Sequence, residues 1–417
     1  MLRRASRAVL LAAANVLVLA ALLLFIEGAL RVLRVHFPAI PRVVFGNVLW
    51  RYDALMGWSH VPGTTGQVDL GGPDAGLVRI NSLGFRGREV TPRKDPGVVR
   101  VLVVGDSFVF GIGVDEEHLF VTRLERRLRD LTGVPHQVVN LGVAGFSTDQ
   151  EYLLLRERGL ALAPDVVLLL MCDNDFEGNA QSFMYLRYYK PYFTIGGDGR
   201  LVAGNLPVPQ LARGQRVRLW LGQSSEVWNL LRFRDSSWPP VRRLLDRLEV
   251  DVSRESSDDP VRLAFLLVQA MRDLASSVGA QFLTFNTGER GEMTRRFVAL
   301  RRHLRGANIA FLGLEGPLAS ARESEPERHW DFGKDHHWNV DAHRLAAEIV
   351  AGRVAALRRE RQANSRVRTA PESPGTAAPG KAGAATPLPR AAPWCGIRRR
   401  RKRPRCPGRR PPPPSPS

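Results

Sequence analysis

The chain has 417 residues, of which 44% are hydrophobic, and a formal net charge of +19. That length suits one large domain or two small ones with tails. Residues 353–417 hold 17 Lys or Arg against two acidic residues, so residues 1–352 carry only +4. A near-neutral body argues against nucleic acid as a partner of the folded part. The three cysteines of the whole chain are Cys172, Cys395 and Cys406. They lack the spacing of a disulfide framework or a metal site.

Residues 1–34 are predicted to form an N-terminal transmembrane helix. Ala8–Ile26 is a run of 19 uncharged, mostly apolar residues. This is long enough to span a bilayer, whereas the apolar core of a cleavable signal has about 7–15 residues. Arg3, Arg4 and Arg7 precede the run and favour a cytoplasmic amino terminus. We expect a retained signal anchor in the cell membrane and a periplasmic domain; a cleaved signal and a buried soluble helix are the alternatives.

Residues 35–98 are rich in Pro, Gly and Arg and are predicted to pack on the main domain as an extension. From residue 99 to 357, strand-like and helix-like patterns alternate, which predicts an α/β domain with a right-handed parallel sheet covered on both faces. Asp149 is expected to cap the second helix. The expected strands are 99–104, 137–141, 165–171, 281–285 and 309–312, and the expected helices are 116–131, 149–162, 260–278, 293–304 and 340–357.

Two segments depart from this alternation. Residues 176–256 form an insertion that carries many aromatic residues with arginines between them. It is either a lid or substrate platform, or a subdomain that buries its own aromatic side chains. Residues 358–417 are rich in Ala, Pro, Gly and Ser and then turn basic, so they are predicted to be a disordered tail without a core.

Polar residues follow three of the expected strands: Ser107 the first, residues 142–145 the second, and Asn174 the third. The carboxyl ends of parallel strands share one edge of a sheet, where open α/β folds build their sites. A fourth polar cluster, residues 335–339, directly precedes the last helix. A serine, a histidine and free N–H donors are the groups that acyl transfer requires.

Four segments in this order resemble the sequence blocks of the SGNH (GDSL-type) hydrolases: 105–108, 140–145, 174–175 and 335–337. The resemblance extends over about residues 99–357, excluding the insertion. It implies a flavodoxin-like, three-layer α/β/α fold. It also implies an activity on carboxylic esters through a serine nucleophile, without a cofactor.

The resemblance assigns roles residue by residue. Ser107 is the implied nucleophile, His337 the implied base and Asp335 its partner acid. The implied oxyanion hole consists of the N–H groups of Ser107 and Gly145 and the side-chain amide of Asn174.

The chain departs from the family pattern at two blocks. Cys172-Asp173-Asn174-Asp175 stands where the family has Gly-x-Asn-Asp. Lys334 occupies the position three residues before His337, where the family has Asp, and Asp335 stands two residues before it. That shorter spacing is similar to the alginate acetyltransferase-like branch of the superfamily. Asp331, six residues before His337, is the alternative acid.

The sequence thus predicts a membrane-anchored serine esterase, or O-acyl esterase, that acts on a small-molecule or glycan ester outside the cytoplasm. One alternative is an O-acyltransferase of an envelope polysaccharide. Another is a catalytically idle glycan-binding or assembly protein on the same fold. A metal site is disfavoured, because four histidines lack ligand spacing: His329, His336, His337 and His343.

Overall fold

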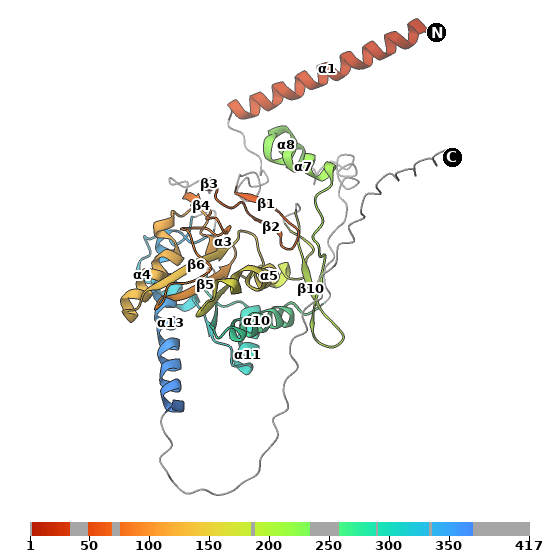
Figure 1. The fold of residues 1–417 in the computed structure, drawn as a ribbon. Helices are drawn as coiled ribbons and strands as arrows, with labels where there is room; N and C mark the ends of the chain where they lie inside the picture. Colours follow the sequence, from red (N-terminus) through yellow and green to blue (C-terminus); the bar gives the residue numbers. More distant parts are fainter. Residues whose placement is uncertain are drawn as a thin grey trace, which may run out of the picture. The chain divides into compact units, whose positions relative to one another are not determined.

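A computed structural model describes residues 2–33, 49–68, 76–184, 188–233, 258–288, 291–332 and 336–369. Its contacts divide the chain into Met1–Ser365 and Arg366–Ser417. Of the second unit only residues 366–369 are among those described, so most of the tail expected at 358–417 lies outside them. The first unit is described below (Figure 1).

The core is a five-stranded sheet in the order β13-β12-β7-β5-β6, and every neighbouring pair is parallel. In chain order this is the flavodoxin-like arrangement 2-1-3-4-5, in which the chain first adds a strand on one side of β5 and then continues on the other. The predicted α/β fold class is therefore confirmed. The strands are β5 (Val99–Gly105), β6 (His136–Gly142), β7 (Val166–Met171), β12 (Gln281–Asn286) and β13 (Phe311–Leu312).

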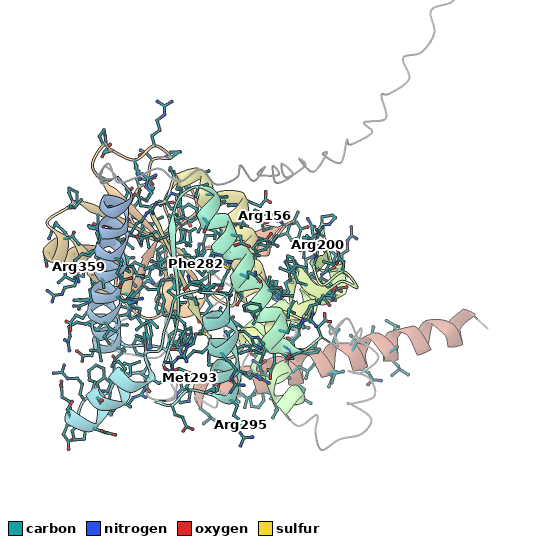
Figure 2. All side chains as sticks on the ribbon, turned by 90° about the horizontal axis from the view of Figure 1, so that it is seen from below. Arg156, Arg200, Phe282, Met293, Arg295 and Arg359 are labelled. Carbon is teal, nitrogen blue, oxygen red and sulfur yellow. The ribbon has the colours of Figure 1, made fainter. Side chains whose placement is uncertain are left out.

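Both faces of the sheet are buried, which explains why its strands are apolar runs without alternation. Leu102 and Val104 of β5 belong to one buried cluster, whereas Val101 and Val103 belong to another. The first cluster includes side chains of α5 (Thr148–Leu154), α10 (Pro260–Ser277) and α11 (Arg295–Gly306). The second includes side chains of α4 (Phe120–Thr132), α12 (Glu315–Ser324) and α13 (Val340–Thr369). In Figure 2, Arg295 and Arg359 lie on the outside of these helix layers.

Three helix boundaries differ from expectation. The helix expected from residue 116 begins at Phe120. The N–H of Phe120 donates a hydrogen bond to Nδ1 of His343 at 2.9 Å. The helix expected to reach residue 162 is α-helical only as far as Leu154. A π-helical turn (Leu155–Gly159) and a 3₁₀ turn (Leu160–Leu162) follow it. Helix α13 runs beyond Leu357 to Thr369, and its Arg361 donates to the carbonyl of Gly279 at 2.9 Å. The first turns of the expected tail are thus part of this helix.

Small hairpins and helices surround the core. The extension contributes β1 (Trp50–Asp53) paired with β2 (Gly57–His60), and β3 (Thr65–Val68) paired with β4 (Gly76–Arg79). The insertion contributes β8 (Phe183–Met184) with β9 (Tyr188–Tyr189), β10 (Tyr192–Ile195) with β11 (Leu201–Gly204), α7 (Arg213–Ser224) and α8 (Glu226–Phe233).

Helix α1 (Leu2–Val32) contains the one segment among the described residues that is long and apolar enough to cross a membrane. This segment, Leu10–Val32, has a mean hydropathy of 2.5 and is not buried by the rest of the protein.

Arg86 fixes the extension to the core. Its side chain is 3% exposed and donates to the carbonyls of Phe110 and Gly111 at 2.7 and 2.5 Å. It also donates to the carbonyl of Val114 at 2.5 Å. These carbonyls end the short helix α3 (Ser107–Phe110) and the loop after it. Burial lowers the pKa of Arg86 to about 10, so the guanidinium stays charged at neutral pH.

Replacement of Arg86 by Met leaves the buried carbonyls of Phe110 and Val114 without a donor, whereas that of Gly111 still accepts the N–H of Val114 at 3.2 Å. Each orphaned group costs about 1–3 kcal/mol. We expect Arg86→Met to lower the free energy of unfolding by at least about 2 kcal/mol, measured by urea denaturation. Arg79→Gln is the control, because Arg79 pairs with Glu116 at the surface, where an ion pair contributes about 0–1 kcal/mol. Equal losses in the two variants would contradict this role for Arg86.

Candidate active site

Ser107 stands at the carboxyl end of β5 and begins α3, with Asp106 as the N-cap. Oδ1 of Asp106 accepts the N–H of Phe108 at 3.0 Å, which fixes the turn. The chain can turn this tightly because Gly105 precedes it: a Cβ there would lie 2.4 Å from Cγ2 of Val109. Ser107 is therefore held by a buried strand on one side and a capped turn on the other.

His337 lies directly against this serine. Its Nε2 is 2.6 Å from Oγ of Ser107, although 230 residues separate the two in the chain. The imidazole packs on the ring of Phe108, with ring centres 4.8 Å apart. Trp338 contacts the same ring edge-on and donates from Nε1 to the carbonyl of Thr287 at 3.2 Å. These contacts hold the imidazole in place beside the hydroxyl.

Of the two candidate acids for His337, the structure describes only Asp331. Asp335 lies outside the described residues. Asp331 is half-buried, and its backbone pairs with that of Trp338. The backbones of Asp331 and Trp338 therefore lie side by side. Both carboxylates remain candidates for orienting the imidazole.

The other histidines have structural or surface positions. His336 is exposed. His343 is 1% exposed, and burial lowers its pKa to about 3, so it is a neutral acceptor for the N–H of Phe120. Within the part of the chain that the structure describes, no cluster of three or more His, Cys, Asp or Glu side chains is arranged to hold a metal ion.

The loop after β6 carries Gly145, which has a left-handed backbone with φ of 80°. Asn140 at the end of the strand ties this loop to α3: its amide donates to the carbonyl of Val109 and accepts the N–H of Gly142, both at 2.8 Å. Gly142 is packed so closely that a Cβ would lie 2.2 Å from the backbone nitrogen of Phe110. The loop is thus fixed to the segment that bears the serine.

Asn174 follows β7 and caps α6 (Asp175–Gly178). Its side chain is exposed and makes no hydrogen bond to another described residue. Cys172, which replaces the family's glycine, is buried, and its thiol bonds to the carboxyl of Asp106. The cysteine thus points away from the surface and connects the strand ends of β5 and β7.

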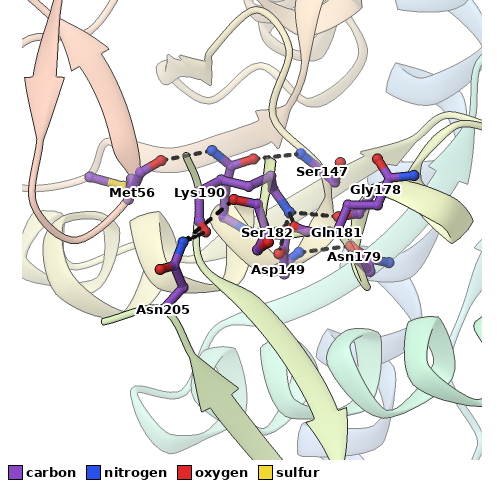
Figure 3. Close-up of polar contacts among 10 residues, drawn as sticks. Met56, Ser147, Asp149, Gly178, Asn179, Gln181, Ser182, Lys190 and Asn205 are labelled. Atoms are coloured by element: carbon purple, nitrogen blue, oxygen red, sulfur yellow. Dashed lines mark hydrogen bonds and ion pairs between the residues drawn. The ribbon is translucent and has the colours of Figure 1, made fainter. Parts of the chain in front are cut away.

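Sequence reasoning missed a buried lysine from the insertion. Nζ of Lys190 lies 2.5 Å from Oδ2 of Asp149, and both side chains are fully buried. Nζ also donates to the carbonyl of Gly178 at 2.6 Å (Figure 3). Asp149 lies in the first turn of α5, after the loop with Gly145, and Gly178 ends α6, after Asn174. One ammonium group therefore joins the two segments that carry these candidate oxyanion donors.

Asp149 is not the helix cap expected from the sequence. Helix α5 begins after Ser147, whose N–H donates to Oε1 of Gln150 at 3.3 Å. Oδ2 of the Asp149 carboxylate bonds instead to Nζ of Lys190, and Oδ1 accepts the N–H of Gln150 at 2.8 Å. Burial raises the pKa of Asp149 to about 7 even beside this lysine.

Further buried carboxyls lie close to this pair. Glu151 is completely buried, and neither of its oxygens has a hydrogen-bond partner among the described residues. Asp175 accepts the N–H of Cys172 at 2.9 Å through Oδ2. Burial, together with the charges of Asp106 and Asp149, raises the pKa of both Glu151 and Asp175 well above the usual range. One lysine cannot neutralise so many carboxylates, so this cluster retains protons at neutral pH.

Glu151→Gln is expected to change the pH dependence of stability. Between the unfolded pKa near 4.5 and its raised folded value, the folded state binds more protons than the unfolded one. Stability therefore falls as pH rises, by up to about 1.4 kcal/mol per pH unit from this group. The groups that face it are Asp106, Asp149, Asp175 and Lys190.

The variant lacks this fall. Its free energy of unfolding should therefore decrease less between pH 5 and pH 8 than that of the wild type. Denaturant titrations across this range measure the difference. The control is Glu157→Gln, in which the exposed glutamate six residues further along is replaced. Parallel profiles for Glu151→Gln and the wild type would show that Glu151 holds no proton.

Neither a family model nor a curated protein matches the sequence. Among solved structures, an acetyl xylan esterase is 15% identical, covers 61% of this chain and 100% of its own, and has a TM-score of 0.35. A catalytic mutant of an acetylxylan esterase from Geobacillus stearothermophilus is 12% identical, with coverages of 62% and 93% and a TM-score of 0.33.

A protein assigned to the lipolytic G-D-S-L family from Desulfitobacterium hafniense DCB-2 is 12% identical, with coverages of 61% and 98% and a TM-score of 0.32. The G-D-S-L family is the one that the sequence blocks resemble.

Proposed function

We propose that this chain is an SGNH-type serine esterase. The observation that supports this most directly is the 2.6 Å separation between Nε2 of His337 and Oγ of Ser107. A serine hydroxyl is a weak nucleophile until a neighbouring base takes its proton, and this distance is within the range for that transfer. The pair lies at the carboxyl edge of the sheet. At this point the chain passes from β5 to β6 on one side, and the later strands β7, β12 and β13 are added on the other side.

In the proposed reaction, Nε2 of His337 accepts the hydroxyl proton while Oγ of Ser107 bonds to the ester carbonyl carbon. The N–H groups of Ser107 and Gly145 and the amide of Asn174 stabilise the resulting oxyanion. His337 then gives the proton to the departing alcohol, which leaves an acyl group on Ser107. Water, activated by the same imidazole, releases the acid and restores the serine.

A fluorophosphonate probe tests the nucleophile. We expect the probe to label the full chain covalently and Ser107→Ala to abolish the label, because Oγ is the atom that attacks phosphorus. Hydrolysis of p-nitrophenyl acetate should fall by about 10³ or more in the same variant. Ser82→Ala is the matched control, since Ser82 is exposed and its hydroxyl donates to Oε2 of Glu89 at 2.5 Å.

Two results would refute the proposal. A label that survives in Ser107→Ala would place the nucleophile elsewhere. A folded wild-type protein that takes no label would favour the catalytically idle reading of this fold.

We further propose Asp335 as the acid that orients His337, on the Asp-x-His spacing. Asp335→Asn should lower kcat on p-nitrophenyl acetate by about 10⁴, the loss associated with neutralising a triad acid. Asp331→Asn should stay within several-fold of the wild type. Circular dichroism of both variants controls for folding, and all rates are measured at one pH. The reverse ranking would transfer the role to Asp331, whose backbone pairs with Trp338.

The proposed location is the outer side of the cell membrane. The apolar segment Leu10–Val32 supports a retained anchor, and the three arginines before it support a cytoplasmic amino terminus. The domain would then act on an extracytoplasmic ester, and an acylated glycan is the carrier that we propose.

A further inference from the structure

A pocket lies outside the α/β core, between the β1–β2 hairpin of the extension and the β9 and α7 segments of the insertion. Its volume is about 240 Å³. Five aromatic residues line it: Trp50, Tyr52, Trp58, Tyr188 and Tyr189. This size is below the range of about 300–1,000 Å³ for pockets that take drug-sized ligands, so it suits a single ring with its substituents.

The pocket is also positively charged. Arg51 and Arg216 both line it, and no acidic residue does. Both side chains are exposed. Nε of Arg51 donates to Oγ of Ser59 at 3.5 Å, and among the described residues neither arginine forms an ion pair with a carboxylate. An arginine presents a planar fork of N–H donors that matches a carboxylate and can also stack on an aromatic face. The wall thus offers aromatic faces for the apolar side of a ring and guanidinium groups for an anion.

The walls are held rigidly. Gly57 has a φ of +84°, and a Cβ there would lie 2.4 Å from the carbonyl oxygen of Tyr189. The hydroxyl of Tyr52 donates to the carbonyl of Val208. The amide of Gln215 donates to the hydroxyl of Tyr189 at 3.1 Å. A pocket formed in advance binds with a smaller loss of conformational freedom.

The floor of the pocket contacts the candidate oxyanion loop. Nε1 of Trp58 donates to the carbonyl of Ala144 at 3.1 Å, and Ala144 immediately precedes Gly145. The indole also packs edge-on against Phe146, with ring centres 5.5 Å apart. The same tryptophan thus supports the pocket on one side and both neighbours of Gly145 on the other.

We propose that this pocket binds a carboxylate-bearing sugar unit of the ester's carrier. The sugar ring lies against the aromatic wall, and its carboxylate binds Arg51 and Arg216. An aliphatic acyl chain would leave both guanidinium groups without an anionic partner, and so would a neutral sugar. The binding part of this inference stands alone, whereas the link to ester cleavage rests on the proposed function.

The binding test uses the full chain with Ser107→Ala, so that no ester chemistry intervenes. Tri-galacturonate and the neutral galactose trisaccharide of the same linkage are titrated at fixed salt and followed by calorimetry and tryptophan fluorescence. We expect the acidic trisaccharide to bind at least about tenfold more tightly. Arg216→Gln should weaken its binding by roughly ten- to a hundredfold, the equivalent of one charge-assisted hydrogen bond.

Arg213→Gln is the matched control, because Arg213 begins the same helix α7 and does not line the pocket. It should change the affinity by less than twofold. Equal affinity for the two trisaccharides, or equal losses in Arg216→Gln and Arg213→Gln, would overturn the proposal. So would binding to phosphatidylglycerol vesicles, but to neither sugar, that Arg216→Gln abolishes. That result would indicate a lipid headgroup site, which the contact between Glu27 of α1 and the start of α8 makes the main rival.

A separate measurement distinguishes failure of this inference from failure of the proposed function. Hydrolysis of p-nitrophenyl acetate by Arg216→Gln should equal that of the wild type, because this small ester carries no sugar. Esterase activity without binding of the acidic sugar would refute the pocket's ligand and leave the esterase intact. Binding of the acidic sugar without any esterase activity would uphold the pocket and refute the esterase.

Discussion

The pairing of β5 on both edges is the constraint on which the site depends. β5 bonds to β6 on one side and to β7 on the other, so the chain leaves it in opposite directions at the carboxyl edge. A crevice opens where the two connections diverge. Ser107 stands on β5 at that crevice, Gly145 follows β6 and Asn174 follows β7. The topology alone therefore brings the serine and the two candidate donors to one edge.

Topology does not fix the spacing between these groups, and here the buried charges contribute. Lys190 bonds to Asp149 behind the Gly145 loop and to the carbonyl at the end of α6 behind Asn174. Burying an ion pair is expensive unless its geometry is good and its remaining donors are satisfied. Lys190 meets that condition through two backbone carbonyls, those of Gly178 and Gln181. Such a pair adds little net stability, but breaking it leaves an isolated buried charge, and this favours one arrangement of the loops.

The sequence was sufficient for the sheet and for the residues at its edge. Fully buried parallel strands appear as apolar runs, and Ser107 and Asn174 follow two of those runs directly. The contacts of Arg86 with Phe110, Gly111 and Val114, and those of Lys190 with Gly178 and Gln181, were not predictable, because these partners are backbone carbonyls, which any residue type supplies. Asp149 was misread as a cap because an acid at a helix start usually is one. Only the fold shows that a lysine 41 positions later reaches it.

The end of α13 was also beyond sequence reasoning. Residues after 357 are basic and lack an apolar stripe, so their composition resembles that of a tail. The helix continues because its preceding turns are anchored by buried alanines and valines, and because Arg361 finds the carbonyl of Gly279. A helix that is already nucleated extends with one new backbone bond per residue, and this needs no apolar face.

The extension, which lies outside the α/β core, contacts the region of the Gly145 loop at two places. Arg86 holds the carbonyls that end α3, and Asn140 joins α3 to the start of the Gly145 loop. From the other side, Trp58 bonds to Ala144 within that loop. A ligand that moves Trp58 in the aromatic pocket would therefore shift the carbonyl of Ala144, next to Gly145. Through this one hydrogen bond, the extension would connect the proposed pocket with the candidate oxyanion loop.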